Sequence, residues 1–173
     1  MNIKDHIASI IDFPKKGIIF RDVTPILKDP ACMKEVTDAF AKFIKKTGAQ
    51  MVIAPEARGF FFGLPAALSC DIGFAPVRKP GKLPRKTITQ SYDLEYGTDR
   101  LEIHEDAIQP GTKVVIIDDL LATGGTMEAI VKMVEHLQGE VVGIGFVIEL
   151  DDLKGRDKFK DIPILALTHY QGE

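Results

Sequence analysis

The sequence is poor in cysteine and has no long apolar run. Its 173 residues include only Cys32 and Cys70, too few for a disulfide framework, and there is no CxxC or His-x-x-x-His spacing. No apolar run approaches the roughly 18 residues that cross a bilayer. The first residues also lack the charged and then apolar plan of a signal peptide. These features predict a cytoplasmic protein that needs no membrane and no structural metal.

An excess of positive charge and two common nucleotide motifs are missing as well. The formal net charge of −3 argues against broad nucleic-acid binding, which favours a basic face. No G-x-x-x-x-G-K-[ST] segment occurs, which excludes a P-loop NTPase. Gly143 and Gly145 lack the third glycine of a dinucleotide fingerprint, and we interpret them as close backbone packing within a strand.

Strand-like and helix-like segments alternate along most of this chain, whose length predicts one domain, residues 1–173. The rhythm predicts an α/β fold in which helices flank a central parallel sheet. The exception is the basic stretch from Arg78 to Gln90, a long connection of the kind that often serves as a lid. The expected strands are residues 51–54, 72–77, 114–117, 141–148 and 164–167, and the expected helices are residues 3–11, 30–47, 60–69 and 127–137.

The most informative segment is residues 114–126. Four aliphatic residues predict a strand buried on both faces, and Asp118 and Asp119 follow where α/β sheets bind ligands. Small residues then lead into a helix whose first N–H groups can hold a phosphate. The pattern fits a phosphorylated sugar with free hydroxyls. The alternative is a plain strand-turn-helix in which Asp119 caps the turn and Asp118 is a buried ion-pair partner.

This segment resembles the phosphoribosyl-pyrophosphate motif of the type I phosphoribosyltransferases, in the form that their adenine-using members carry. Residues 13–25, 55–59 and 78–97 also resemble segments of that family, in the same order along the chain. The resemblance spans Phe13 to about Arg156. It implies the type I phosphoribosyltransferase fold, with an amino-terminal hood at about residues 1–30 and a flexible catalytic loop at about residues 79–95.

The resemblance implies a role for each part of residues 118–126. Asp118 and Asp119 bind the 2′ and 3′ hydroxyls of the ribose. Mg²⁺ is implied as the cofactor, held mainly by substrate oxygens and water and by no direct protein ligand. The residues that hold the 5′-phosphate are Ala122, Thr123, Gly124, Gly125 and Thr126.

The resemblance further implies that four side chains bind the pyrophosphate: Arg58, Arg78, Lys82 and Tyr96. In the family the peptide bond before this first arginine is cis, so the Ala57–Arg58 bond is expected to be cis. Two alternatives stay open from the residues alone. Arg58 could be a surface ion-pair residue, and the basic stretch, which also carries Arg85 and Lys86, could be a solvated loop.

The base is expected to lie under the hood. By resemblance, Ile19, Phe20 and Arg21 bind adenine, with backbone groups reading its 6-amino edge. Glu95 is implied to sit near N7 of the purine and to exchange a proton there, so that Glu95 and Arg58 are the expected catalytic residues.

The resemblance implies a purine-salvage transferase that joins adenine to 5-phosphoribosyl 1-pyrophosphate, giving AMP and pyrophosphate. Family members are commonly homodimers, and no nucleic-acid partner is implied. A sister enzyme that uses xanthine or another base is one alternative. Another is a transcription regulator that senses the same ribose donor, although this short acidic chain leaves no room for a helix-turn-helix.

Overall fold

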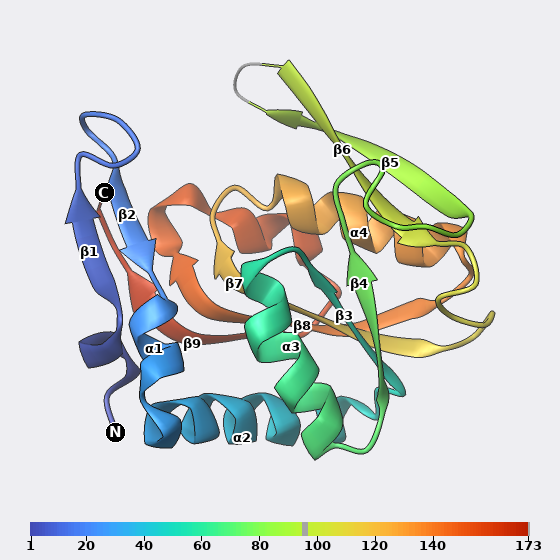
Figure 1. Ribbon diagram of the computed structural model, residues 1–173, viewed down its shortest axis with the longest axis horizontal. Coiled ribbons are helices and arrows are strands. Elements are labelled where there is room, and N and C mark those ends of the chain that lie inside the picture. The colour runs from blue at the N-terminus through green and yellow to red at the C-terminus, as the bar shows by residue number, and fades with distance from the viewer. Residues whose placement is uncertain (95–96, 173) are drawn as a thin grey trace.

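A five-stranded parallel sheet forms the centre of the computed structural model, which describes residues 1–94 and 97–172. Its strands are β3 (Met51–Pro55), β4 (Gly73–Val77), β7 (Lys113–Leu121), β8 (Glu140–Leu150) and β9 (Ile164–Tyr170), in the order β4-β3-β7-β8-β9. Helices α2 (Pro30–Thr47) and α3 (Arg58–Ser69) cover one face, and α4 (Gly125–His136) covers the other (Figure 1). The expected fold class is confirmed.

Strand β7 is buried on both faces, as its run of aliphatic residues predicts. Val115 and Ile117 pack into the hydrophobic cluster shared with α2 and α3. Val114 and Ile116 point to the opposite side and join the cluster that contains α4. All four side chains are fully buried. The strand therefore fixes the position of whatever follows it at the carboxyl edge of the sheet.

An antiparallel hairpin of β5 (Thr87–Leu94) and β6 (Gly97–His104) also covers the face that α4 covers (Figure 1). Residues 87–90 were expected to belong to an irregular basic connection, and they form a strand instead. The reason is their partner, because β6 supplies a backbone ladder and buries Leu101 and Ile103 against the core. The irregular connection is shortened to residues 78–86.

The helix expected at residues 3–11 is wrong. Only Ile3–His6 turns, as the 3-10 helix η1, with the Asn2 side chain accepting from the Lys4 N–H at 3.3 Å. Residues Ala8–Ile11 form β1, which pairs antiparallel with β2 (Ile19–Asp22). The apolar spacing also fits a helix face, but pairing with the partner strand decides the outcome. This hairpin and the short helix α1 (Thr24–Lys28) form the hood, which stands at one edge of the molecule beside β9 (Figure 1).

Helix α2 begins and ends where the sequence predicts. The Asp29 carboxylate accepts from the N–H groups of Ala31 and Cys32, and these bonds, with a further one to His6, lower the pKa of Asp29. Gly48 ends the helix in the left-handed conformation, at φ 72°. No helix in the described part of the chain is long and apolar enough to cross a membrane.

Gly143 and Gly145 lie within β8 under the rings of α2, which confirms the interpretation of close packing. A Cβ at Gly143 would lie 2.8 Å from Cζ of Phe43, and a Cβ at Gly145 would lie 2.9 Å from Cε1 of Phe40. Both glycines therefore let α2 approach the sheet more closely than any side chain would allow.

We expect Gly145→Ala to lower the free energy of unfolding by about 1–3 kcal/mol, because the added methyl overpacks against the buried Phe40 ring. Urea denaturation measures this loss. The matched control is the same change in a Phe40→Leu background, where the smaller side chain should relieve part of the cost. Strictly additive costs in the double variant would contradict this explanation.

Candidate active site

The carboxyl ends of β3, β4, β7 and β8 meet at one edge of the sheet because these strands are parallel. Asp118 and Asp119 lie at this edge, but inside β7 rather than after it as expected. Pairing with β8 continues through Leu120 and Leu121, opposite Ile148 and Glu149, and this extends the strand. The two acids are thus held by a rigid element of the fold.

Arg58, the first residue of α3, lies across from these acids. Its Nε donates to Oδ2 of Asp119 at 2.5 Å, and the Asp119 side chain is only 6% exposed. About half of the Arg58 side chain remains exposed. A nearly buried carboxylate is stable only with such a partner. The ion pair therefore joins the loop after β3 to the end of β7.

Asp118 is half-buried and lies close to the start of α3. Its Oδ1 accepts from the Asp119 N–H at 2.8 Å. Burial, followed by repulsion from the neighbouring Asp119 carboxylate, raises the pKa of Asp118 well above its usual value. A Cβ at Gly59 would lie 3.1 Å from that same Oδ1, so glycine here lets the helix approach the carboxylate.

The segment between β7 and α4 has the backbone of an anion site. Gly124 has φ 89°, a conformation that glycine adopts without strain, and α4 begins at the next residue. The first N–H groups of a helix have no partner within that helix, and they attract anions. A cavity of about 220 Å³ lies at this helix start, and it is lined by Arg58, Phe146 and residues 118–127.

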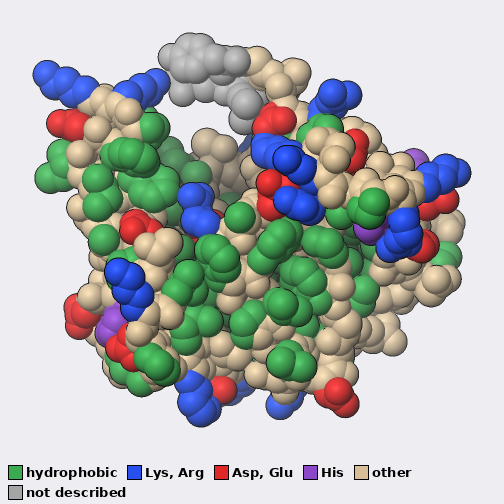
Figure 2. Space-filling view, in the orientation of Figure 1, with side chains coloured by type: hydrophobic (Ala, Val, Ile, Leu, Met, Phe, Trp, Pro, Cys, Tyr) green, Lys and Arg blue, Asp and Glu red, His purple; other side chains and the backbone are tan. Residues whose placement is uncertain are grey.

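A second cavity of about 300 Å³ adjoins the first, because Arg58, Asp118, Asp119 and Thr126 line both. Its far side is formed by residues 55–57 at the end of β3 and by Lys79 and two residues of the hairpin. Together the cavities join the acid pair, the helix start and the loop after β3 into one site. Figure 2 shows the hollow between the hood and the hairpin.

Charged pairs order the basic side of this site. Arg78 Nε donates to Oε1 of Glu56 at 3.2 Å, and the Lys79 N–H donates to the same oxygen at 2.7 Å. Lys79 Nζ forms an ion pair with Asp99 and donates to the Tyr92 hydroxyl at 3.0 Å. Burial opposes the charge of Lys79, but its bonds to Asp99 and Tyr92 outweigh burial and raise its pKa.

The expected cis bond lies one residue earlier than predicted. The Glu56–Ala57 peptide is cis, and the prediction of a cis Ala57–Arg58 bond is wrong. The physical reason is the helix start. Ala57 already has right-handed helical angles, φ −103° and ψ −31°, as the residue that leads into α3 at Arg58.

Not every expected pyrophosphate residue lines the two cavities. Arg58 does, whereas Arg78 and Lys82 are not among the lining residues of either one. Glu95 and Tyr96 lie outside the described residues. Arg85 pairs with Asp106 and Lys86 with Glu105, and neither cation is among the lining residues of the two cavities, as a solvated part of the connection would have it.

The hood contributes a third, apolar cavity of about 510 Å³, which includes Arg58 among its lining residues. The Phe20 ring lies 5.3 Å from Cζ of Arg58 and contacts the Phe13 ring edge-on. Alternation along β2 sends the Arg21 side chain elsewhere, to Oγ of Ser9 and over the ring of Tyr170. Strand β2 is the inner strand of the hairpin, and within the described chain it pairs only with β1 (Figure 1).

Three contacts of this site were missed by the sequence reasoning. They are the pairing of Glu56 with Arg78, the pairing of Lys79 with Asp99, and the close approach of Gly59 to Asp118. For the approach to Asp118, the glycine that follows Arg58 in the sequence was a signal that backbone must come close there. The ion pairs join residues more than 19 positions apart and leave no periodic trace in the sequence.

Comparison with known proteins agrees with this geometry. Residues 22–168 match the phosphoribosyl transferase domain family. The adenine phosphoribosyltransferase of Lactobacillus gasseri is 55% identical over 172 residues, which cover 99% of this chain and 98% of that protein.

Solved structures show the same fold. The crystal structure of adenine phosphoribosyltransferase from Thermoanaerobacter pseudethanolicus superposes with a TM-score of 0.94 at 51% identity, covering 97% of this chain and 98% of that one. The Saccharomyces cerevisiae enzyme, complexed with D-2,5-dideoxy-2,5-imino-altritol 1,6-bisphosphate and adenine, gives a TM-score of 0.91 at 38% identity over 96% of both chains. The chain therefore belongs to the adenine phosphoribosyltransferase family of type I phosphoribosyltransferases.

Proposed function

We propose that this site transfers the 5-phosphoribosyl group of 5-phosphoribosyl 1-pyrophosphate to adenine, releasing AMP and pyrophosphate. The observation that carries the proposal is the meeting of three parts at one sheet edge. An acid pair, a helix start suited to a phosphate, and an arginine that also lines an apolar cavity share the same continuous space. A reaction between a charged sugar and an apolar base needs these neighbouring environments.

Asp118 and Asp119 hold the ribose, and residues 122–126 hold its 5′-phosphate. The Asp119 oxygens face Arg58 in the free protein, and carboxylate oxygens accept hydrogen bonds from vicinal hydroxyls. Helix α4 begins directly after Gly124, and its first residues line the cavity that a phosphate would fill, where unpaired N–H groups of a helix start favour an anion. The sugar is thereby fixed on both sides of its reacting carbon, C1.

The leaving pyrophosphate is bound by Arg58, with Arg78 and Lys82 from the basic connection and with Tyr96. Bond breaking at C1 develops negative charge on the pyrophosphate and an oxocarbenium-like cation on the ribose. Arg58 is already placed in the cavity, so its charge stabilises this transition state without rearranging the fold. Adenine N9 attacks C1 from the face opposite the pyrophosphate, with inversion, while Glu95 accepts the proton from N7. Closure of the basic connection, which β5 shortens to residues 79–86, excludes water.

The site also fits Mg²⁺. Asp118 presents a half-buried carboxylate to both cavities, and hard oxygen donors suit this ion. Asp119 is engaged by Arg58, so the two acids alone form no complete ligand set. Bound Mg²⁺ would neutralise pyrophosphate charge and would be held mainly by substrate oxygens and water, with no direct protein ligand, while Asp118 stays with the ribose hydroxyls.

Adenine lies under the hood, against the apolar cavity that Ile10, Phe13 and Phe20 line. The inner edge of β2 offers backbone groups of Ile19 and Arg21, which can pair with the 6-amino edge. A 6-oxo purine would leave such groups mispaired, and this gives the site its choice of base.

The test is AMP formation from adenine, the ribose donor and Mg²⁺, run beside hypoxanthine, guanine and xanthine. The proposal predicts a product from adenine alone. Activity on another base would keep the donor site and overturn the hood assignment. If a protein that binds the donor makes no product with any base, it is a sensor rather than an enzyme.

The double variant Asp118→Asn with Asp119→Asn is expected to weaken donor binding by at least about 100-fold. It replaces two charge-assisted hydrogen bonds of about 1.5 kcal/mol each. Isothermal titration with the donor measures the loss, and circular dichroism checks the fold. Asp38→Asn, on the exposed side of α2, is the matched control. Unchanged affinity in the double variant would remove both acids from the site.

We also propose that two copies of the chain associate through α3. Phe61, Leu64 and Leu68 are 38%, 53% and 79% exposed and recur along one side of this helix. Figure 2 shows apolar side chains gathered over this part of the surface. Exposed apolar patches of this kind mark protein interfaces. The free Cys32 and Cys70 agree with a reducing, cytoplasmic location for the dimer.

Sedimentation velocity is expected to give twice the 19.1 kDa chain mass for the natural sequence. Leu64→Glu with Leu68→Glu should give the single-chain mass, because two charges would be buried in the interface. Leu153→Glu, at another exposed leucine, should leave the dimer intact. A monomeric natural protein, or a dimer that survives the double change, would contradict the α3 interface.

A further inference from the structure

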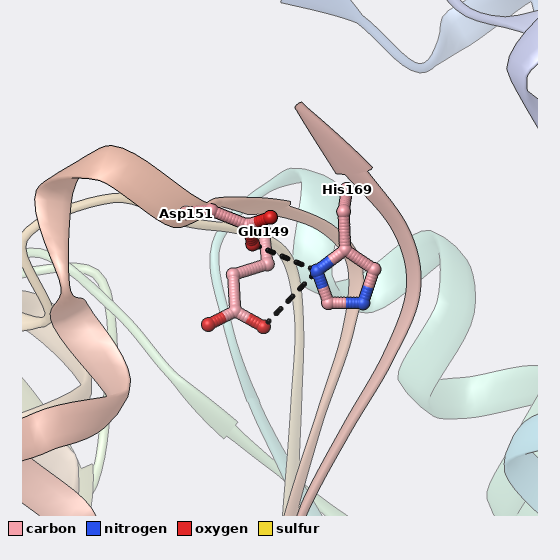
Figure 3. Close-up of side chains that lie close together, drawn as sticks. All are labelled: Glu149, Asp151 and His169. Carbon is pink, nitrogen blue, oxygen red and sulfur yellow. Dashed lines mark hydrogen bonds and ion pairs between the residues drawn. The ribbon is translucent and has the colours of Figure 1, made fainter. Parts of the chain in front are cut away.

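A charged cluster lies at the carboxyl ends of β8 and β9, and it contains none of the residues assigned above. Glu149 of β8 is 3% exposed, and Arg156 donates to it from Nε to Oε1 at 2.7 Å and from Nη2 to Oε2. His169 of β9 directs its Nδ1 to Oδ1 of Asp151 at 2.8 Å and lies 3.6 Å from Oε2 of Glu149 (Figure 3).

The cluster is an ion-pair network. Glu149, Asp151 and His169 bring three possible ligand atoms within 4.8 Å of one another, but the Arg156 guanidinium occupies both oxygens of the buried Glu149. A cation in that position competes with a metal ion for the same oxygens. The network fixes the position of Arg156, and through Arg156 it fixes the segment between β8 and β9.

That chain forms two short 3-10 helices, η2 (Asp151–Leu153) and η3 (Gly155–Phe159), and η3 lies directly against the phosphate-binding segment. A Cβ at Gly155 would lie 2.3 Å from the carbonyl oxygen of Ala122. A Cβ at Gly124 would lie 3.1 Å from the carbonyl oxygen of Gly155 and 3.3 Å from the Phe159 ring. The ring of Phe159 is itself buried in the core beside α4.

In the sequence of η3, Arg156 therefore lies between Gly155 and Phe159, which both approach the phosphate-binding segment. The forked bond from Arg156 to Glu149 fixes the position of this helix. Two parallel hydrogen bonds set direction as well as distance. In the sheet, Leu121 of β7 lies opposite Glu149 of β8. The Glu149 carboxylate and the phosphate-binding segment that follows Leu121 therefore lie at the same level of the sheet edge. A shift of η3 would move the backbone at residues 122–124.

We propose that the Glu149–Arg156 pair positions the 5′-phosphate loop, and that it controls affinity for the ribose-phosphate half of the substrate without touching it. This inference depends on the phosphate-binding role proposed for residues 122–126. Adenine binds under the hood, on β2, so the pair should act on the donor and leave the base unaffected.

Arg156→Gln is expected to raise the KM for the donor and the Kd for ribose 5-phosphate about 10- to 100-fold, the scale of a loop displaced by about an ångström. The KM for adenine should stay within about twofold. Arg156→Lys keeps the charge but loses the fork, and should fall between Arg156→Gln and the natural protein. Lys34→Gln, which breaks an exposed ion pair on α2, is the control.

Arg156→Gln leaves the buried Glu149 carboxylate without its partner and could fail to fold for that reason. A second variant therefore keeps this ion pair. Gly155→Ala leaves the ion pair in place and pushes a methyl group against the Ala122 carbonyl. It should give the same loss, selective for the donor, in a protein with a natural circular dichroism spectrum.

The inference is overturned if folded Arg156→Gln or Gly155→Ala binds ribose 5-phosphate normally, or if the KM values for donor and adenine rise together. The second result would mean that the pair only stabilises the fold. A natural protein that neither forms AMP nor binds ribose 5-phosphate would overturn the proposed function itself, and the inference with it.

Discussion

The ion pair between Arg58 and Asp119 is the interaction on which the site depends. Asp119 lies near the carboxyl end of a strand buried on both faces, so its carboxylate needs a partner, and the first residue of α3 supplies one at 2.5 Å. The bond holds the loop after β3 against the end of β7, and both of its residues line the two adjoining cavities. The charges that stabilise the free protein are then the charges that a pyrophosphorylated ribose would meet.

The other parts of the site are arranged around this ion pair. Helix α4 begins at Gly125 and presents its N–H groups to one cavity, and the hood places Phe20 close to the Arg58 guanidinium. Glycine matters where backbone must come close, as at Gly59 beside Asp118 and at Gly124 beside η3. Strand β7 and helices α3 and α4 pack side chains into the two hydrophobic clusters, so the acid pair and the helix start are held by rigid structure.

Much of this could be predicted from the sequence because local signals were strong. Four aliphatics before Asp118 predicted the central strand, and Asp29 with Gly48 predicted the limits of α2. The errors arose where a distant partner decides. The isoleucines of residues 3–11 have helical spacing, yet Ile10 pairs with Phe20 in a hairpin. The pairing of Glu149 with Arg156 leaves no periodic trace, since Glu149 lies near the end of β8 and Arg156 lies in the short 3-10 helix η3.

The most direct test of the account is a crystal structure of the protein with 5-phosphoribosyl 1-pyrophosphate bound. The account predicts the 5′-phosphate within hydrogen-bond distance of the backbone N–H groups of residues 122–126. It also predicts the ribose hydroxyls on Asp118 and Asp119, and the pyrophosphate beside Arg58. A donor bound with its 5′-phosphate at any other place, or with both carboxylates untouched, would contradict it.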